Sequence, residues 1–188
     1  MKKKLILYFL LINSFLAFIL VVNSQSRIDV EPNLQLANDN VDLIDISEFD
    51  IQKRGLLPTS LNTIRLNQTA FLQKFGLPLE KKIIYSEIDE TNMDHLLYNG
   101  LDVWFMNNNL ESLSLNSENY CLIFLNGNEL KVGDDVSLII SLFPKSWLNK
   151  REDLIFVGLK DKIRISDMNL IFEFDLTTNL ISGIHFEY

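Results

Sequence analysis

Two stretches of this chain place apolar residues at helical spacing, and each stops after a few turns at a proline. The first is TAFLQKFGLP, residues 69–78, and the second is VSLIISLFPKSW, residues 136–147. Their apolar positions are Phe71, Leu72 and Phe75 in the first, and Val136, Ile139, Ile140 and Phe143 in the second. These positions follow the i, i+3, i+4 spacing of a helix with one buried face. We therefore predict two short helices.

The ends of both predicted helices carry typical start and stop residues. Asn67 or Thr69 begins the first helix and Asp134 or Asp135 begins the second, since Asn, Thr and Asp side chains accept bonds from the first free backbone amides. Gly76 suits the left-handed conformation that follows many helices, and prolines cannot continue a helix because they lack the backbone amide. The two helices therefore end near Pro78 and Pro144.

Each predicted helix is followed by three stretches in which apolar and polar residues alternate, as in strands with one buried face. These stretches are 82–88, 98–106 and 107–115 after the first helix, and 154–160, 167–176 and 177–186 after the second. The spacing between the copies is about 67 residues at the helix and 70 at the last hairpin, as expected for a duplication whose loops differ in length. A further strand, LNTIRL at 61–66, leads into the first helix.

These elements predict an α+β fold made of two tandem strand–helix–meander repeats, with short helices packed on an antiparallel sheet. The predicted boundaries are a signal peptide at 1–24, a leader at 25–60, repeat 1 at 61–117 and repeat 2 at 118–188. Within the leader, residues 25–40 are polar and predict a flexible segment. VDLIDISEF at 41–49 alternates and predicts an edge strand.

The first residues have the three parts of a secretory signal: Lys2–Lys4, an apolar run from Leu5 to Val22, and small residues near Ser24. Cleavage after Ser24 is the favoured interpretation, and an uncleaved membrane anchor is the alternative. Under either interpretation the remaining chain is exported, to the periplasm or the medium. We expect no membrane contact beyond this segment.

Charge restricts the classes of partner. The full chain has a formal net charge of −8, and residues 25–188 carry 14 basic against 25 acidic residues, a formal charge of −11. Such acidity argues against nucleic acid, which is bound through Lys and Arg on phosphates. It favours a protein partner that is basic.

The helix phrases and the strands that follow them resemble the tandem-repeat fold of the β-lactamase-inhibitor-protein family and single-copy outer-membrane assembly lipoproteins. The phrases are LNQTAFLQKFGLP and LKVGDDVSLIISLFPKSW; the first lacks the early glycine of the family phrase and the second lacks the late one. Asn126-Gly127 through Pro144 also resembles exported Bacteroidota-type proteins to which no activity is assigned. The resemblance implies binding through the sheet and its hairpin loops, and it implies no individual site residue.

Few residues point to catalysis or metal binding. The chain has two histidines and one cysteine, and their spacing matches no zinc motif, so we expect no metal and no cofactor. Cys121 lies in the apolar run YCLIFL and is expected to be buried. The segment SEIDETNMDH, 86–95, is interpreted as a solvated loop, with His95 at its border with a strand. Glu173 and Asp175 could form a carboxylate pair on one side of a strand, although such pairs are common on acidic surfaces.

Alternation predicts which side chains point to the solvated face of the sheet. Trp104 is out of phase with Val103 and Phe105, and His185 is out of phase with Ile184 and Phe186. The predicted binding residues on this face and its hairpin tips are Asp102, Trp104, Asn107, Asn108, Glu173 and His185. The alternative is that Trp104 packs under the second repeat or the leader. Trp147, after the second helix, is the other aromatic of interest.

The functional hypothesis from sequence is therefore a non-catalytic, exported protein-binding module, inhibitor-like or otherwise. An envelope-assembly factor is the second hypothesis, and a hydrolase with an unrecognised site is the third. The oligomeric state is left open.

Overall fold

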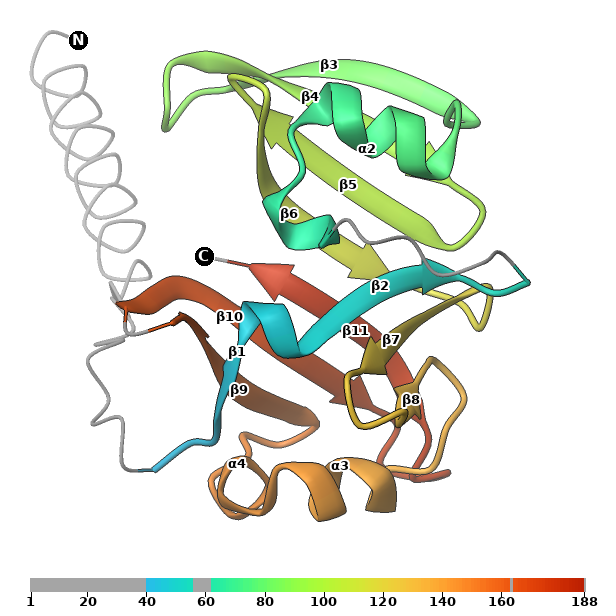
Figure 1. Ribbon diagram of the computed structural model, residues 1–188, viewed down its shortest axis with the longest axis vertical. Helices are drawn as coiled ribbons and strands as arrows, with labels where there is room; N and C mark the ends of the chain where they lie inside the picture. Colours follow the sequence, from blue (N-terminus) through green and yellow to red (C-terminus); the bar gives the residue numbers. More distant parts are fainter. Residues whose placement is uncertain (1–39, 56–61, 163, 188) are drawn as a thin grey trace, which may run out of the picture. The chain divides into compact units, whose positions relative to one another are not determined.

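Two β-sheets and three short α-helices form the part of the chain described by the computed structural model, residues 40–55, 62–162 and 164–187 (Figure 1). The strands are β1 (Leu43–Asp45), β2 (Phe49–Lys53), β3 (Glu80–Ser86), β4 (Thr91–Tyr98), β5 (Leu101–Met106), β6 (Asn109–Leu115), β7 (Tyr120–Phe124), β8 (Glu129–Leu130), β9 (Leu154–Asp161), β10 (Arg164–Phe174) and β11 (Ile181–Glu187). The helices are α2 (Gln68–Phe75), α3 (Ser137–Leu142) and α4 (Pro144–Leu148), with short 3₁₀ helices η1 (Ile46–Glu48) and η2 (Thr63–Arg65).

The larger sheet has eight strands in the order β1-β9-β10-β11-β6-β5-β4-β3. Its neighbouring strands are antiparallel except for β1, which pairs parallel with β9. The smaller sheet has three strands in the order β2-β7-β8. This arrangement confirms the α+β class, the antiparallel sheet and the short helices.

The core lies against one face of the larger sheet, which we call the inner face. Leu101, Val103 and Phe105 of β5 are 0–1% exposed, and the alternate residues of that strand remain partly exposed. The small sheet packs on this face through Phe49, whose ring stacks 5.6 Å from that of Phe186. α3 is followed by Phe143, whose ring lies 5.8 Å from that of Phe172.

Helix α2 matches its sequence prediction. The Asn67 side chain caps it by accepting a bond of 2.9 Å from the amide of Ala70. Gly76 ends it with a φ of 80°, a conformation that glycine adopts without strain. Phe71 and Phe75 are buried, and the Phe71 ring lies 5.4 Å from that of Phe105. The helix covers the inner face of the sheet.

The second predicted helix is two helices. α3 begins after Val136 and has no side-chain cap, so the cap expected at Asp134 or Asp135 is wrong. Asp135 lies one residue before the cap position, and its carboxylate accepts a bond of 2.8 Å from the amide of Ser137. Pro144 ends α3 but also begins α4, because a proline at the first helical position loses no intrahelical bond. Trp147 of α4 packs against Phe174, with their rings 5.7 Å apart. It is therefore a partly buried core residue.

One strand prediction and one loop prediction were wrong. Instead of the strand expected at 61–66, the Asn62 side chain caps the 3₁₀ helix η2 by accepting a bond from the amide of Ile64. The expected loop at 86–95 is a turn followed by β4, so the first meander has four strands. β4 was missed because it begins with the mostly polar residues TNMDH, which have no apolar alternation. It forms a strand because it pairs with β5.

The edge strand expected at 41–49 is β1, at one end of the larger sheet. It is shorter than expected because Asp45 caps η1, and the chain then continues as β2 in the smaller sheet. The predicted signal peptide, its cleavage site and residues 25–39 lie outside the described residues. In the part of the chain that is described, no helix has the length and apolar character needed to cross a membrane.

A buried ion pair joins β2, η2 and α2. The ammonium of Lys74 lies 2.6 Å from Oδ2 of Asp50 and 2.7 Å from Oγ1 of Thr63, and its side chain is 4% exposed. Oδ1 of Asp50 accepts two bonds from Thr63, from its amide at 2.9 Å and its hydroxyl at 2.7 Å. Burial lowers the pKa of Lys74, and the Asp50 carboxylate opposes that shift.

Cys121 is buried in β7, as expected, and burial raises the pKa of its thiol from 9.0 to about 11. The unfolded chain loses this proton near pH 9 and the folded protein only near pH 11. The contribution of the protonated thiol to stability is therefore complete below pH 9 and is lost as pH rises through 11. We expect the wild type to lose about 2 kcal/mol more than Cys121→Ala between pH 8 and pH 10.5. Urea unfolding of both proteins at the two pH values measures this difference; equal losses would contradict it.

Candidate functional site

The candidate site is the outer face of the larger sheet, formed by side chains that alternate with the buried ones. We call it the open face and define it by these residues of β4, β5, β6, β10 and β11: His95, Asp102, Trp104, Ser112, Ser114, Glu173 and His185. Each is partly exposed. Register connects them: Trp104 pairs with His95 and Ser112, while Ser114 pairs with Asp102 and His185.

An aromatic stack lies at one side of the open face. The rings of Trp104 and His95 are parallel within 7°, with centroids 3.9 Å apart. Burial lowers the pKa of His95, so the imidazole is neutral at pH 7. Its Nε2 atom is buried and bonds to no described residue. The stack therefore presents a large aromatic surface, the side-chain type that supplies much of the energy at protein interfaces.

A row of three polar side chains, from β6, β11 and β10, lies at the other side of the open face. Nδ1 of His185 is 2.9 Å from Oγ of Ser114, and Nε2 of His185 is 3.4 Å from Oε2 of Glu173. Gly183 makes this placement possible, because a Cβ there would lie 2.5 Å from Nε2 of His185 and 3.2 Å from Oε2 of Glu173. The imidazole thus lies over the backbone of the neighbouring glycine. The carboxylate and the ring occupy one small area of the open face.

Ser114, His185 and Glu173 have the residue types of a hydrolytic triad. Acyl transfer also needs backbone amides or other donors that stabilise a developing oxyanion. Ser114 lies inside β6 and is paired on both sides, with Asp102 of β5 and His185 of β11. Its backbone groups therefore belong to the sheet ladders. Ser114 and His185 therefore have the residue types of a nucleophile and a base, but the backbone amide of Ser114 is not free to stabilise an oxyanion.

The structure brings together four of the six residues predicted from sequence: Asp102, Trp104, Glu173 and His185 share the open face. Asp102 accepts a bond of 3.2 Å from the Asn116 side chain.

Asn107 and Asn108 lie elsewhere, at the tip of the β5–β6 hairpin. Their φ angles are 50° and 69°, so they form the two-residue turn that requires positive φ at both positions and favours Asn and Gly. Their identity is explained by the turn. Both residues are exposed.

The carboxylate pair considered from sequence is separated. A bulge between Glu173 and Phe174 shifts the register. Asp175 then lies beyond the strand, where Oδ1 accepts bonds from the amides of Thr177 and Thr178 at 2.7 and 2.8 Å. Those bonds lower the pKa of Asp175. Its carboxylate stabilises a turn, and Glu173 faces His185 instead.

Sequence reasoning missed His95 and Ser114 as members of the site. Alternation in MDHLLY, with Leu96 and Tyr98 buried, places His95 on the outer face. The same pattern in LESLSL places Ser114 opposite to the buried Leu113 and Leu115. Both signals were present in the sequence. In the described part of the chain, His, Cys, Asp and Glu side chains form no group of three that could hold a metal ion.

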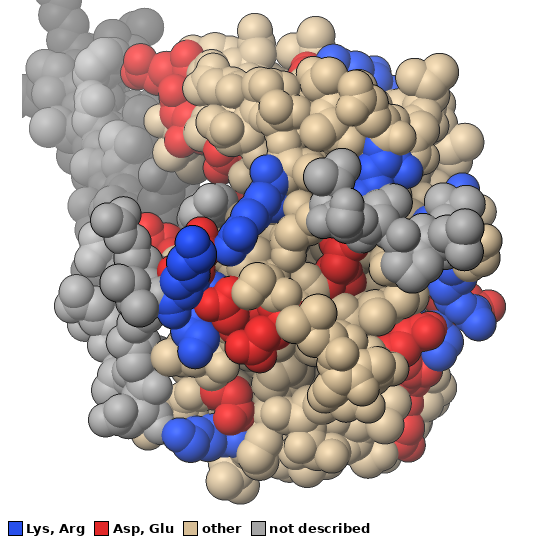
Figure 2. All heavy atoms as spheres, in the orientation of Figure 1, with Lys and Arg blue, Asp and Glu red and all other residues tan. Residues whose placement is uncertain are grey.

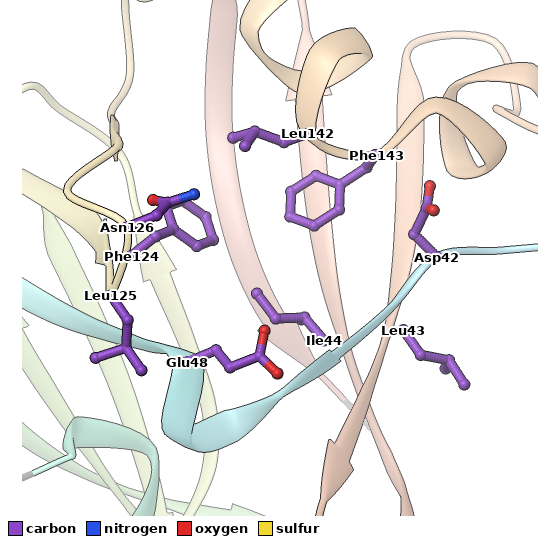
Figure 3. Close-up of a pocket in the computed structure, with 9 residues that line it drawn as sticks. All are labelled: Asp42, Leu43, Ile44, Glu48, Phe124, Leu125, Asn126, Leu142 and Phe143. Carbon is purple, nitrogen blue, oxygen red and sulfur yellow. The ribbon is translucent and has the colours of Figure 1, made fainter.

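A separate hollow of about 440 Å³ lies among β1, η1, the end of β7 with the turn that follows it, and the end of α3 (Figure 3). Its lining is Asp42, Leu43, Ile44, Glu48, Phe124, Leu125, Asn126, Leu142 and Phe143. Asp42 is engaged in structure, since Oδ2 accepts a bond from the Ser146 amide and its own amide donates to Oγ of Ser146, both at 2.9 Å. The hollow contains none of the predicted site residues. It does not gather histidines, and we do not assign the site to it.

Comparison with known proteins adds little to this geometry. No protein-family model matches the chain, and no curated protein sequence matches it. Among solved structures, the fold is similar to an extracellular protein containing a SCP domain from Bacillus anthracis str. Ames, with a TM-score of 0.42 and 14% sequence identity. The match covers 72% of this chain and 49% of the other, so this chain spans about half of that protein's length. A similarity this distant does not indicate what the chain binds.

Proposed function

We propose that this chain is an exported, non-catalytic binding module that recognises a protein partner through the open face. The observation that carries the proposal is the parallel stack of Trp104 and His95 on a sheet face whose opposite side holds the core. A tryptophan that served only to pack the core would point to the inner face. Trp104 points away from it, paired in register with His95 and Ser112.

The chemistry of the open face favours a partner that supplies a cationic side chain. An arginine or lysine on the partly exposed Trp104 ring would gain cation–π energy. Asp102, the next outward residue of β5 before Trp104, offers a carboxylate near that cation. Glu173 lies three strands away on β10 and offers a carboxylate to a second basic side chain of the same partner. The net charge of the chain, −8, attracts basic proteins over longer distances.

The test is a capture experiment from envelope extract with residues 25–188, comparing the wild type with Trp104→Ala/Glu173→Lys. Loss of an aromatic hot spot costs 2 kcal/mol or more, which corresponds to a roughly 30-fold weaker affinity. We therefore expect the wild type to hold a partner that the variant loses. Circular dichroism confirms that the variant is folded.

The matched control is Leu148→Ala/Glu152→Lys, which removes one apolar side chain and reverses one charge outside the residues that define the open face. Leu148 is 80% exposed and Glu152 is exposed, so neither change should affect folding. This control should capture the partner as the wild type does. Equal capture by all three proteins would refute binding through the open face.

The tandem duplication and the β-lactamase-inhibitor-like resemblance belong to the same proposal. α2 precedes a meander that ends in β6, α3 and α4 precede one that ends in β11, and β6 and β11 are neighbours. By position in the sheet, β10 corresponds to β5 and β9 corresponds to β4, rather than to 82–88 as the sequence suggested. Export rests on the predicted signal at 1–24, and a role in envelope assembly is the alternative binding function.

Hydrolysis is the second candidate, favoured by the contacts among Ser114, His185 and Glu173. It is weaker because the serine backbone is engaged in two ladders. Incubation with a serine-reactive phosphonate probe separates the candidates. Labelling of the wild type but not of Ser114→Ala would support hydrolysis, whereas the binding proposal expects no labelling of either.

A further inference from the structure

Strand β3 is the most exposed strand of the larger sheet and lies at its end. All of its residues from Glu80 to Tyr85 are exposed, including Ile83 at 67%, Ile84 at 41% and Tyr85 at 58%. Leu77, Leu79 and Ile88 beside the strand are 78–93% exposed. In Figure 2, the end of the molecule where Figure 1 places β3 is mostly uncharged.

Such an edge is unusual, because exposed apolar edge strands pair with other chains and are normally short, charged or covered. The opposite edge of the sheet follows that rule, since β1 has three residues. β3 has seven residues, and only its first three are charged. Among the described residues, no strand pairs with the outer side of β3. An apolar edge of this length indicates a strand that receives a partner strand.

The sequence of β3 is complementary to itself in one antiparallel register. With a two-fold axis at Ile84, Ile84 lies opposite its own copy and Ile83 lies opposite Tyr85 of the other copy. Lys81 then lies opposite Glu87, the first residue of the following turn. Lys82 lies opposite Ser86. From position 81 to position 87, every apolar residue therefore faces an apolar one and Lys81 faces a residue of opposite sign, both of which stabilise cross-strand pairs. Glu80 lies opposite Ile88, outside this stretch.

The symmetric registers centred on the neighbouring residues bring less favourable side chains together. An axis at Tyr85 places Ile83 opposite Glu87. An axis at Lys81 or Lys82 places two lysines opposite each other, and like charges in that position are destabilising. An axis at Ile83 places Lys82 opposite Ile84 and Lys81 opposite Tyr85. Lys81 already lies 2.9 Å from Asp94 within its own chain, and its side chain is 46% exposed, so it can also reach a second carboxylate.

We propose that two copies of this chain associate through antiparallel pairing of their β3 strands, centred on Ile84, which joins the two larger sheets into one. The interface lies in the plane of the sheet. It therefore leaves Trp104 and His185 accessible, and the dimer would present two open faces side by side. This proposal is independent of the partner proposed for that face.

Disulfide trapping in the full chain tests the pairing. Residues directly opposite in an antiparallel pair have Cα atoms about 4.5–5.5 Å apart, within the range of a disulfide. Ile84→Cys should form a covalent dimer under mild oxidation. Ile83→Cys should not, because its copy lies two positions along the partner strand. Each change is made in a Cys121→Ala background, which alone should stay uncrosslinked.

Light scattering supplies the second measurement. The wild type should have the mass of a dimer, and Ile84→Lys should have the mass of a monomer because it places two ammonium groups on the axis. Leu148→Lys, at another exposed apolar site, should remain dimeric. A monomeric wild type, or trapping at residue 83 in place of 84, would overturn the proposal. A dimer that survives Ile84→Lys would also overturn it.

Discussion

Replacing Asp50 by alanine is expected to lower the free energy of unfolding by about 3–5 kcal/mol, because the change leaves a buried cation without its carboxylate. Lys74 is 4% exposed and Asp50 is 17% exposed, so water cannot replace the lost contact well. The change also removes the acceptor of the amide and hydroxyl of Thr63, which is fully buried. Urea unfolding followed by circular dichroism measures the loss.

The double variant Asp50→Ala/Lys74→Met is the control for this interpretation. It removes both charges and keeps an unbranched apolar side chain in place of the lysine stem, so it should be more stable than Asp50→Ala alone. If the single and double variants are equally stable, the cost arises from Thr63 and not from the cation. A loss below about 1 kcal/mol for Asp50→Ala would contradict burial of the pair.

Alternation in the sequence was sufficient to predict that Trp104 and His185 point away from the core. It separated Trp104 and His185 from their buried neighbours without any knowledge of the topology, because side chains of a strand alternate strictly between its two faces. The same signal predicted the strands of the second meander to within a few residues. Alternation could not predict which outward residues of different strands lie next to one another, because that depends on the register between segments that are distant in the chain.

β4 shows where the pattern was hidden. TNMDH is polar, and its inward residue Asp94 is held by Lys81 and Gln68 at 2.9 and 2.7 Å instead of being buried in the core. A polar residue on the inner face breaks the apolar alternation that identifies a strand. His95 was therefore assigned to the border of a loop, and its stack with Trp104 was missed.

The smaller sheet depends on contacts that no local pattern contains. Phe49 of β2 pairs with Phe124 of β7, far along the chain. η1 separates β2 from β1, so one alternating segment supplies strands to both sheets. The polar cluster of Asp50, Thr63 and Lys74 was likewise invisible from sequence, because its members come from three separate elements.

Phe71→Ala is expected to cost about 3–5 kcal/mol, the usual range for removing a buried phenylalanine side chain. Its side chain is fully buried, and its ring lies 4.5, 5.4 and 6.2 Å from those of Phe75, Phe105 and Tyr98. An eight-residue helix is marginal by itself, so α2 depends on these contacts. Thermal and urea unfolding measure the loss.

Leu72→Ala is the matched control, since Leu72 is adjacent on the same helix and only partly buried. It should cost clearly less than Phe71→Ala, and equal costs would show that helix propensity rather than packing holds α2. Comparing Phe71→Ala with Trp104→Ala separates stability from binding. Because Phe71 packs against the inner face, Phe71→Ala should keep the wild-type affinity of the open face under conditions where it is folded. Trp104→Ala should lose affinity without losing stability.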